Sequence, residues 1–224
     1  MNIKKKEEAL GLILEQKLLP LYYHDSADIS RDILHALYVG GIRVVEYTNR
    51  GENALENFKF LKKIQSELQG MMLGIGTIKT TTDATKFMDA GADFIVCPTV
   101  NTEVATIVSS AGLLWIPGCM TPTEISIAES SGATLVKIFP GNLLGPSYVE
   151  SIKELFPQIK FMPTGGVEAD KKNIKKWFRA GVSAVGMGSR LIYKELVGKE
   201  DFKGLKKAAS AALKLVRQHS LSVN

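Results

Sequence analysis

Lys137 is the residue whose type and position most clearly indicate chemistry. It lies in the segment TLVKIFP (134–140), between Val136 and Ile138, and lysine is rarely buried without a partner. Burial disfavours the ammonium form of a lysine and therefore favours a free amine near neutral pH. A free amine attacks a carbonyl carbon and forms a Schiff base, which withdraws electrons from neighbouring bonds. We therefore predict a catalytic nucleophile; the alternative is a lysine paired with a carboxylate for structure alone.

A carboxylate, a hydroxyl and a guanidinium alternate in the segment RVVEYTNR (43–50). Glu46, Thr48 and Arg50 share one parity with Val44, and side chains along a strand alternate between its two faces. If Val44 faces the interior of the fold, the three polar side chains form a column that rises toward the end of the strand. The alternative interpretation is a Glu46–Arg50 pair that serves only structure.

Glycine-rich motifs end the last two apolar segments, PTGG at 163–166 and GMGS at 186–189. Glycine lets backbone N–H groups approach an anion closely, and the loops after the last two strands of a barrel commonly bind phosphate. Tight turns needed for chain closure are the alternative. A third motif, LGIGT (73–77), places Thr77 at a strand end, where its small residues are predicted to leave space for a ligand. Together these groups suit cleavage of a carbon–carbon bond in a phosphorylated keto acid through an imine.

Eight short apolar runs would position these residues. They are 18–23, 43–48, 71–76, 93–98, 113–118, 134–140, 160–166 and 184–189. The segments between them have helical spacing, which indicates βαβ units and a parallel sheet. Eight such units predict an α/β fold of the (β/α)8 TIM-barrel type, with the active groups at the C-terminal ends of the strands. A doubly wound open sheet is less favoured, because no glycine-rich dinucleotide loop follows the first strand.

Helix boundaries and the N-terminus complete this arrangement. Four glycines are expected to end helices: Gly91, Gly112, Gly132 and Gly181. Thr81 and Thr121 are expected to begin helices as N-caps, with Pro122 at the first helical position. Residues 1–20 read as an amphipathic helix rather than a signal peptide, because glutamates interrupt them, and this helix is expected to plug or flank the barrel base. Residues 1–224 are predicted to form a single domain.

Composition excludes several classes of protein. Apolar residues make up 45% of the 224 and charged residues 23%, as in soluble globular proteins, and no apolar run approaches the roughly 20 residues that span a bilayer. The net charge of +5 suggests nucleic acid, but residues 203–217 hold five basic residues and no acid at helical spacing, which indicates a solvated helix face. Cys97 and Cys119 lack metal or redox spacing and are expected to be reduced, partly buried thiols of a cytoplasmic protein. The three histidines are too scattered for zinc, so we expect no metal and no other cofactor.

These motifs resemble those of the 2-keto-3-deoxy-6-phosphogluconate (KDPG) aldolases and the related 2-keto-4-hydroxyglutarate (KHG) aldolases. The resemblance covers about residues 18–192 in family order. The matching motifs are GGIRVVEYTNR (40–50), GIGT (74–77), IPG (116–118), VKIFP (136–140), MPTGGV (162–167) and GMGS (186–189). Each motif alone is common, whereas the combination is specific.

The resemblance implies a class I aldolase on a (β/α)8 barrel, a homotrimer that acts on a small phosphorylated keto acid. It implies that Lys137 forms the Schiff base with the keto carbon and that Glu46 is the acid and base. Arg50 and Thr77 would hold the carboxylate end of the substrate, with Thr164 near it. The phosphate would be bound by backbone groups of Gly165, Gly166, Gly188 and Ser189.

The sequence also departs from the family pattern. Many members have a basic residue at the end of the first strand, where this chain has Tyr22, Tyr23 and His24. Asn49 and Gly51 replace a leucine and a threonine or serine, and Gly141-Asn142 replaces Ala-Glu. The motifs leave open which keto acid is the substrate: the phosphogluconate, the phosphogalactonate or the hydroxyglutarate compound. A sugar-phosphate isomerase or epimerase, and a non-catalytic phosphometabolite-binding barrel, are the alternative functions, but neither requires a buried lysine.

Overall fold

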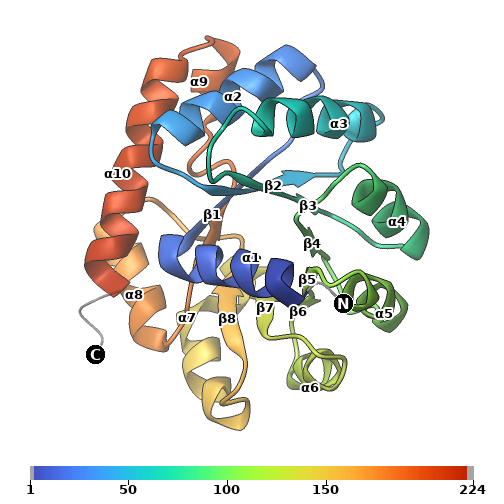
Figure 1. The fold of residues 1–224 in the computed structure, drawn as a ribbon. Helices are drawn as coiled ribbons and strands as arrows, with labels where there is room; N and C mark the ends of the chain where they lie inside the picture. Colours follow the sequence, from blue (N-terminus) through green and yellow to red (C-terminus); the bar gives the residue numbers. More distant parts are fainter. Residues whose placement is uncertain (1–2, 221–224) are drawn as a thin grey trace.

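The computed structural model, which describes residues 3–220, has an α/β fold in which parallel strands alternate with helices (Figure 1). The strands are β1 (Leu18–Tyr22), β2 (Val44–Thr48), β3 (Met72–Gly76), β4 (Phe94–Val96), β5 (Leu114–Ile116), β6 (Gly118–Cys119), β7 (Leu135–Ile138), β8 (Lys160–Pro163) and β9 (Val185–Met187). The helices are α1 (Ile3–Gln16), α2 (Ala27–Val39), α3 (Ala54–Gln65), α4 (Thr81–Asp89), α5 (Thr102–Ser110), α6 (Pro122–Ser130), α7 (Gly141–Ile152), α8 (Lys171–Ala180), α9 (Lys194–Gly198) and α10 (Phe202–Ser220), with a 3-10 turn at Lys153–Leu155.

The strands form two parallel sheets. One has the order β5-β4-β3-β2-β1-β9 and the other the order β6-β7-β8. Each of the eight predicted runs contains a strand, but the fifth is divided at Pro117, which lacks the N–H needed for regular pairing. A single bridge between Thr164 and Gly186 links the end of β8 to β9. The predicted parallel α/β arrangement is confirmed. The regular strand pairing, however, forms two separate sheets and not one closed sheet of eight strands.

Helix α1 closes one end of the strands. In Figure 1 it lies across the front of the strands, while the other helices surround them. Ala9 and Ile13 are fully buried in an inner apolar cluster that also holds Leu19 and Val44. The Gln16 side chain donates to the Val44 carbonyl at 2.9 Å. The N-terminal helix therefore covers the base of the strands as predicted; residues 1–2 lie outside the described residues.

The predicted helix boundaries are mostly confirmed. The four glycines expected to end helices all have positive φ, from 71° at Gly112 to 102° at Gly181. Thr121 caps α6 in a capping box with Glu124, and Pro122 is the first helical residue. The cap of α4 is Thr80 and not Thr81, because Thr80 is extended and its hydroxyl accepts from the Asp83 N–H at 3.1 Å.

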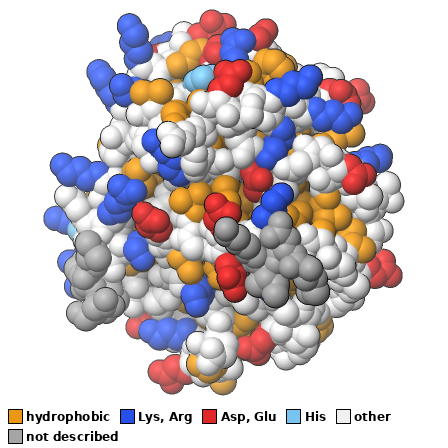
Figure 2. Space-filling model, viewed as in Figure 1, with side chains coloured by type: hydrophobic (Ala, Val, Ile, Leu, Met, Phe, Trp, Pro, Cys, Tyr) orange, Lys and Arg blue, Asp and Glu red, His pale blue; other side chains and the backbone are white. Residues whose placement is uncertain are grey.

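Helix α10 accounts for the excess positive charge. Its apolar stripe is buried, while the basic residues within 203–217 are exposed to solvent. On the face shown in Figure 2, acidic and basic side chains are interspersed. None of the helices within residues 3–220 is both long enough and apolar enough to cross a membrane.

Both cysteines are more buried than predicted. Cys97 is 0% exposed and Cys119 1% exposed, and both are free thiols. The Trp115 indole N–H donates to Cys97 Sγ at 3.3 Å. The expectation of partly buried thiols was wrong, because Cys97 directly follows β4, Cys119 ends β6, and both side chains belong to the apolar cluster between the strands and the outer helices.

Candidate active site

Lys137 and Glu46 face each other inside the fold. Their side chains come from β7 in one sheet and β2 in the other, and Lys137 Nζ lies 3.8 Å from Glu46 Oε1. Lys137 is 4% exposed and Glu46 1% exposed. Val44 and Leu135, two residues before them on the same strand faces, belong to the inner apolar cluster. The parity prediction for Glu46 is therefore confirmed, and the amine does not point into solvent.

The Glu46 carboxylate is held in an environment that favours its neutral form. Neither of its oxygens has a hydrogen-bond donor among the described residues. Burial raises the pKa of Glu46, and the positive charges of Lys137 and Arg50 lower it by less. A carboxyl whose pKa is raised toward neutrality can both accept and return a proton in a catalytic cycle.

Two glycines of the GIGT motif make room for side chains of the protein. A Cβ on Gly76 would lie 1.7 Å from Glu46 Oε1, and a Cβ on Gly74 would lie 2.3 Å from the Phe94 ring. We predicted that these small residues leave space for a ligand. That prediction was wrong for both positions, because Glu46 and Phe94 occupy the space.

Arg50 and Thr77 meet at the C-terminal ends of β2 and β3. Arg50 Nε lies 3.5 Å from Thr77 Oγ1, and Thr77 has a φ of 64°, which is uncommon for a residue other than glycine. Thr48 does not join them, because its buried hydroxyl donates to the Tyr22 carbonyl at 3.3 Å. The predicted column therefore divides into an inner carboxylate, a structural hydroxyl and a rim guanidinium.

Thr164 and the two glycines after it form a second part of the rim. Thr164 is 6% exposed, and its hydroxyl has no hydrogen-bond partner among the described residues. A Cβ on Gly186 would lie 2.3 Å from that hydroxyl, so the glycine permits the approach. Gly165 and Gly166 have φ values of 89° and 70°, which suit glycine. Asn142 lies against both glycines, so a Cβ on Gly166 would come within 2.7 Å of its Cα.

A cavity of about 470 Å³ adjoins this rim. Gly188 and Ser189 line it together with Arg50, whereas Gly165 and Gly166 are outside its lining. Lys137 and Glu46 do not line it either. Arg50 connects the two regions, because it lines the cavity and its positive charge lowers the pKa of Glu46. Tyr22, Tyr23, His24 and Lys194 also line the cavity.

Sequence reasoning missed two residues of the site. Lys194 lines the cavity and begins α9, five residues after Ser189; that closeness to the GMGS motif was the available signal. The Phe139 ring lies with its centroid 5.3 Å from Lys137 Nζ. Phe139 shares the parity of Lys137, which could have indicated it. Within residues 3–220, no three histidine, cysteine, aspartate or glutamate side chains are grouped so that they could hold a metal ion.

Comparisons with known proteins agree with this geometry. The family model described as KDPG and KHG aldolase matches residues 11–208. A 2-dehydro-3-deoxy-phosphogluconate aldolase of Treponema pallidum is 29% identical over 89% of this chain and 93% of its own. A probable 2-dehydro-3-deoxy-6-phosphogalactonate aldolase of Rhizobium meliloti is 26% identical over 80% and 82%. The crystal structure of a 4-hydroxy-2-oxoglutarate/2-dehydro-3-deoxyphosphogluconate aldolase from TTHB1 has a TM-score of 0.79 and 30% identity, covering 93% of this chain and 98% of that one. The chain belongs to the KDPG and KHG aldolase family.

Proposed function

We propose that this protein is a class I aldolase that cleaves 2-dehydro-3-deoxy-6-phosphogluconate to pyruvate and D-glyceraldehyde 3-phosphate. The observation that carries the proposal is the Lys137 amine, buried and 3.8 Å from the Glu46 carboxylate. A lysine in this position can form an imine, and the opposing carboxylate can move the protons that the imine chemistry requires. Membership of the aldolase family supports the same reaction.

The first half of the reaction forms the imine. Lys137 transfers a proton to Glu46, and its nitrogen attacks the keto carbon of the substrate. The resulting carbinolamine loses water when Glu46 returns a proton to the departing hydroxyl. The product is a protonated Schiff base that withdraws electrons from the adjacent carbon–carbon bond.

The second half breaks that bond. Glu46 accepts the proton of the hydroxyl at C4, directly or through water, while the electrons of the C3–C4 bond move to the imine. The aldehyde then leaves, C3 of the enamine takes up a proton, and water hydrolyses the imine to release pyruvate and the Lys137 amine. A well-placed acid and base accelerates such steps by roughly 10²–10⁴-fold.

The rim residues hold the two ends of the substrate. Arg50 and Thr77 bind the carboxylate of the keto acid, with the Thr164 hydroxyl beside it. This assignment is supported by the 3.5 Å approach of Arg50 to Thr77 and by the unpartnered Thr164 hydroxyl. The phosphate binds to backbone N–H groups of the two glycine loops, at Gly165, Gly166, Gly188 and Ser189. The positive φ of the first pair and the cavity lining of the second support this assignment.

Two related keto acids are further candidate substrates. The relative from Rhizobium meliloti is named for the phosphogalactonate compound, and the structure from TTHB1 is also named for 4-hydroxy-2-oxoglutarate. All three compounds would give pyruvate through the same imine. The phosphogluconate and phosphogalactonate compounds differ in configuration at C4 and release the same aldehyde, glyceraldehyde 3-phosphate, whereas 4-hydroxy-2-oxoglutarate releases glyoxylate. A coupled assay of aldehyde release across the three keto acids decides which is preferred.

We infer the remaining properties from the same membership. Residues 1–224 form one domain, and the two sheets together make a closed (β/α)8 barrel. The Thr164–Gly186 bridge and the donation of the Lys137 N–H to the Pro117 carbonyl at 2.8 Å support closure. We propose a homotrimer in the cytoplasm, and sedimentation of the purified protein tests the trimer.

Trapping with pyruvate and borohydride tests the imine. Reduction should fix a pyruvate adduct on Lys137 and abolish activity. The adduct should be absent from Lys137→Met. Lys62→Met is the matched control, because Lys62 pairs with Asp93 at 2.9 Å away from the site. Mass spectrometry of peptides locates the adduct. Full activity after treatment, with Lys137 unmodified, would exclude this mechanism and leave an isomerase or a non-catalytic barrel as the alternatives.

A further inference from the structure

Tyr23 contacts two loops at the rim. It follows β1, and its hydroxyl donates to the Asp25 carboxylate in the same loop at 2.5 Å. The same phenol packs against the backbone of Gly51, in the loop after β2. That second loop carries Arg50. One phenol therefore lies between the loop that precedes α2 and the loop that holds the guanidinium.

Gly51 is the residue that allows Tyr23 this position. A Cβ at Gly51 would lie 2.0 Å from the Tyr23 hydroxyl oxygen and 2.4 Å from Cζ. The φ of Gly51 is outside the left-handed region, so its backbone would accept any residue. The glycine is thus required by the neighbouring phenol and not by the turn.

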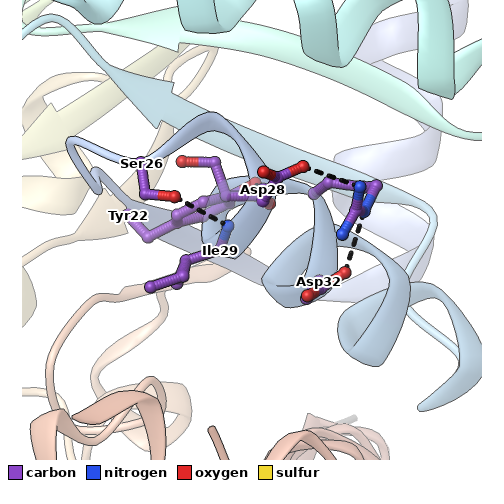
Figure 3. A network of polar contacts seen from close by, with 7 residues as sticks. Tyr22, Ser26, Asp28, Ile29 and Asp32 are labelled. Atoms are coloured by element: carbon purple, nitrogen blue, oxygen red, sulfur yellow. Dashed lines mark hydrogen bonds and ion pairs between the residues drawn. The ribbon is translucent and has the colours of Figure 1, made fainter.

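Buried polar groups hold the Tyr23 loop in place. The His24 carbonyl accepts from Tyr47 Oη at 3.0 Å, Asn57 Nδ2 at 3.1 Å and Ser30 Oγ at 3.1 Å. Figure 3 shows the adjoining first turn of α2, where the Ile29 N–H donates to the Ser26 hydroxyl at 3.3 Å. A carbonyl with three donors in a mostly buried setting resists displacement. Tyr23 is therefore presented by a fixed loop.

We propose that Tyr23 is a positioning and specificity-determining residue, matched to Gly51. It packs against Gly51, the residue after Arg50, and it lines the 470 Å³ cavity together with Arg50 and Ser189. The inference rests on the proposed function, in which this cavity takes the phosphorylated half of the keto acid. Two departures from the family pattern, the tyrosine after the first strand and the glycine after Arg50, are then linked, because the tyrosine fits only beside a glycine.

Kinetics of three variants test the pair. Tyr23→Phe keeps the ring but loses the hydroxyl that donates to Asp25 and packs against Gly51, so KM for the phosphorylated keto acid should rise about 3–10-fold while kcat stays within about twofold. Gly51→Ser should displace the phenol and lower kcat/KM by about tenfold or more. Adding Tyr23→Val to Gly51→Ser should remove the clash, so the serine should cost little once the phenol is absent.

The controls separate this inference from the proposed function. Tyr38→Phe removes a phenol of α2 that donates to the Gln69 carbonyl, outside the site, and should change neither constant. Pyruvate trapping at Lys137 should persist in every variant; its failure in the parent protein would refute the imine mechanism instead. An unchanged KM in Tyr23→Phe, or strictly additive losses in the double variant, would overturn the pairing. Tyr23→Phe decides the question alone if Gly51→Ser does not fold.

Discussion

Glu46 is a buried acid for which the protein provides space but no hydrogen-bond donor among the described residues. Gly76 leaves that space, and Lys137 and Arg50 supply the positive charge that partly offsets desolvation. An ionised carboxylate without hydrogen bonds is costly to bury, which is why its pKa lies above the ordinary 4.5. A raised pKa is the property required by the proton-transfer role that we propose for Glu46.

Replacing Glu46 tests this role. Glu46→Gln should lower kcat by roughly 10²–10⁴-fold, because the amide cannot accept a proton. In the parent protein kcat/KM should rise with pH above 4.5, as the Glu46 carboxyl with its raised pKa ionises, and that rise should be lost in the variant. Glu56→Gln, which removes a carboxylate paired with Lys59 on the surface, should leave the whole profile unchanged. An intact acidic limb in Glu46→Gln would assign the limb to another group.

At the scale of elements, α1 contributes to the interior although no active group lies on it. Ile13 is fully buried in the inner cluster, beneath the strands that carry Glu46 and Lys137. The helix thus supplies the apolar floor that strands alone would leave open to water. Its contribution should appear in stability and only slightly in catalysis.

Truncation of that side chain measures the contribution. Ile13→Ala should lower the free energy of unfolding by about 2–5 kcal/mol, since it leaves a cavity in a closely packed interior. Denaturant titration measures the loss, and KM should change little. Ile127→Ala provides the comparison, because Ile127 is 43% exposed on α6 and should cost far less. Equal losses in the two variants would show that α1 does not seal the base.

At the scale of the whole molecule, one outer cluster connects the strands with the surrounding helices. It runs from Leu18 near the N-terminus to Val216 in α10 and includes both tryptophans, Trp115 of β5 and Trp177 of α8. Continuous packing of this kind predicts that the chain unfolds as one unit.

Fluorescence of the two tryptophans tests that unity. Variants that keep only Trp115 or only Trp177 should give denaturant midpoints that coincide with each other and with circular dichroism at one protein concentration. The two probes lie on distant elements, strand β5 and helix α8, so a second domain would separate their transitions. Two distinct midpoints would contradict a single domain.

Local patterns in the sequence were enough to predict most of the elements and the burial of Lys137 and Glu46 in their strands. Alternation of apolar residues determines which face of a strand is buried, and a charged residue on that face is exceptional wherever the strand lies. The predicted start of α4 was wrong by one residue: the N-cap is Thr80 and not Thr81. Either threonine could cap a helix, and only the extended backbone at Thr80 decides between them.

Distances across the fold depended on the tertiary structure alone. Lys137 and Glu46 belong to different sheets, so their 3.8 Å separation follows from strand order and stagger, which no local pattern encodes. The same holds for Gly76 beneath Glu46 and Gly51 beside Tyr23, where the sequence shows a glycine but not the side chain that requires it. The alternation of side chains along a strand determines which face a residue occupies, whereas the packing of distant elements determines which residue lies opposite it.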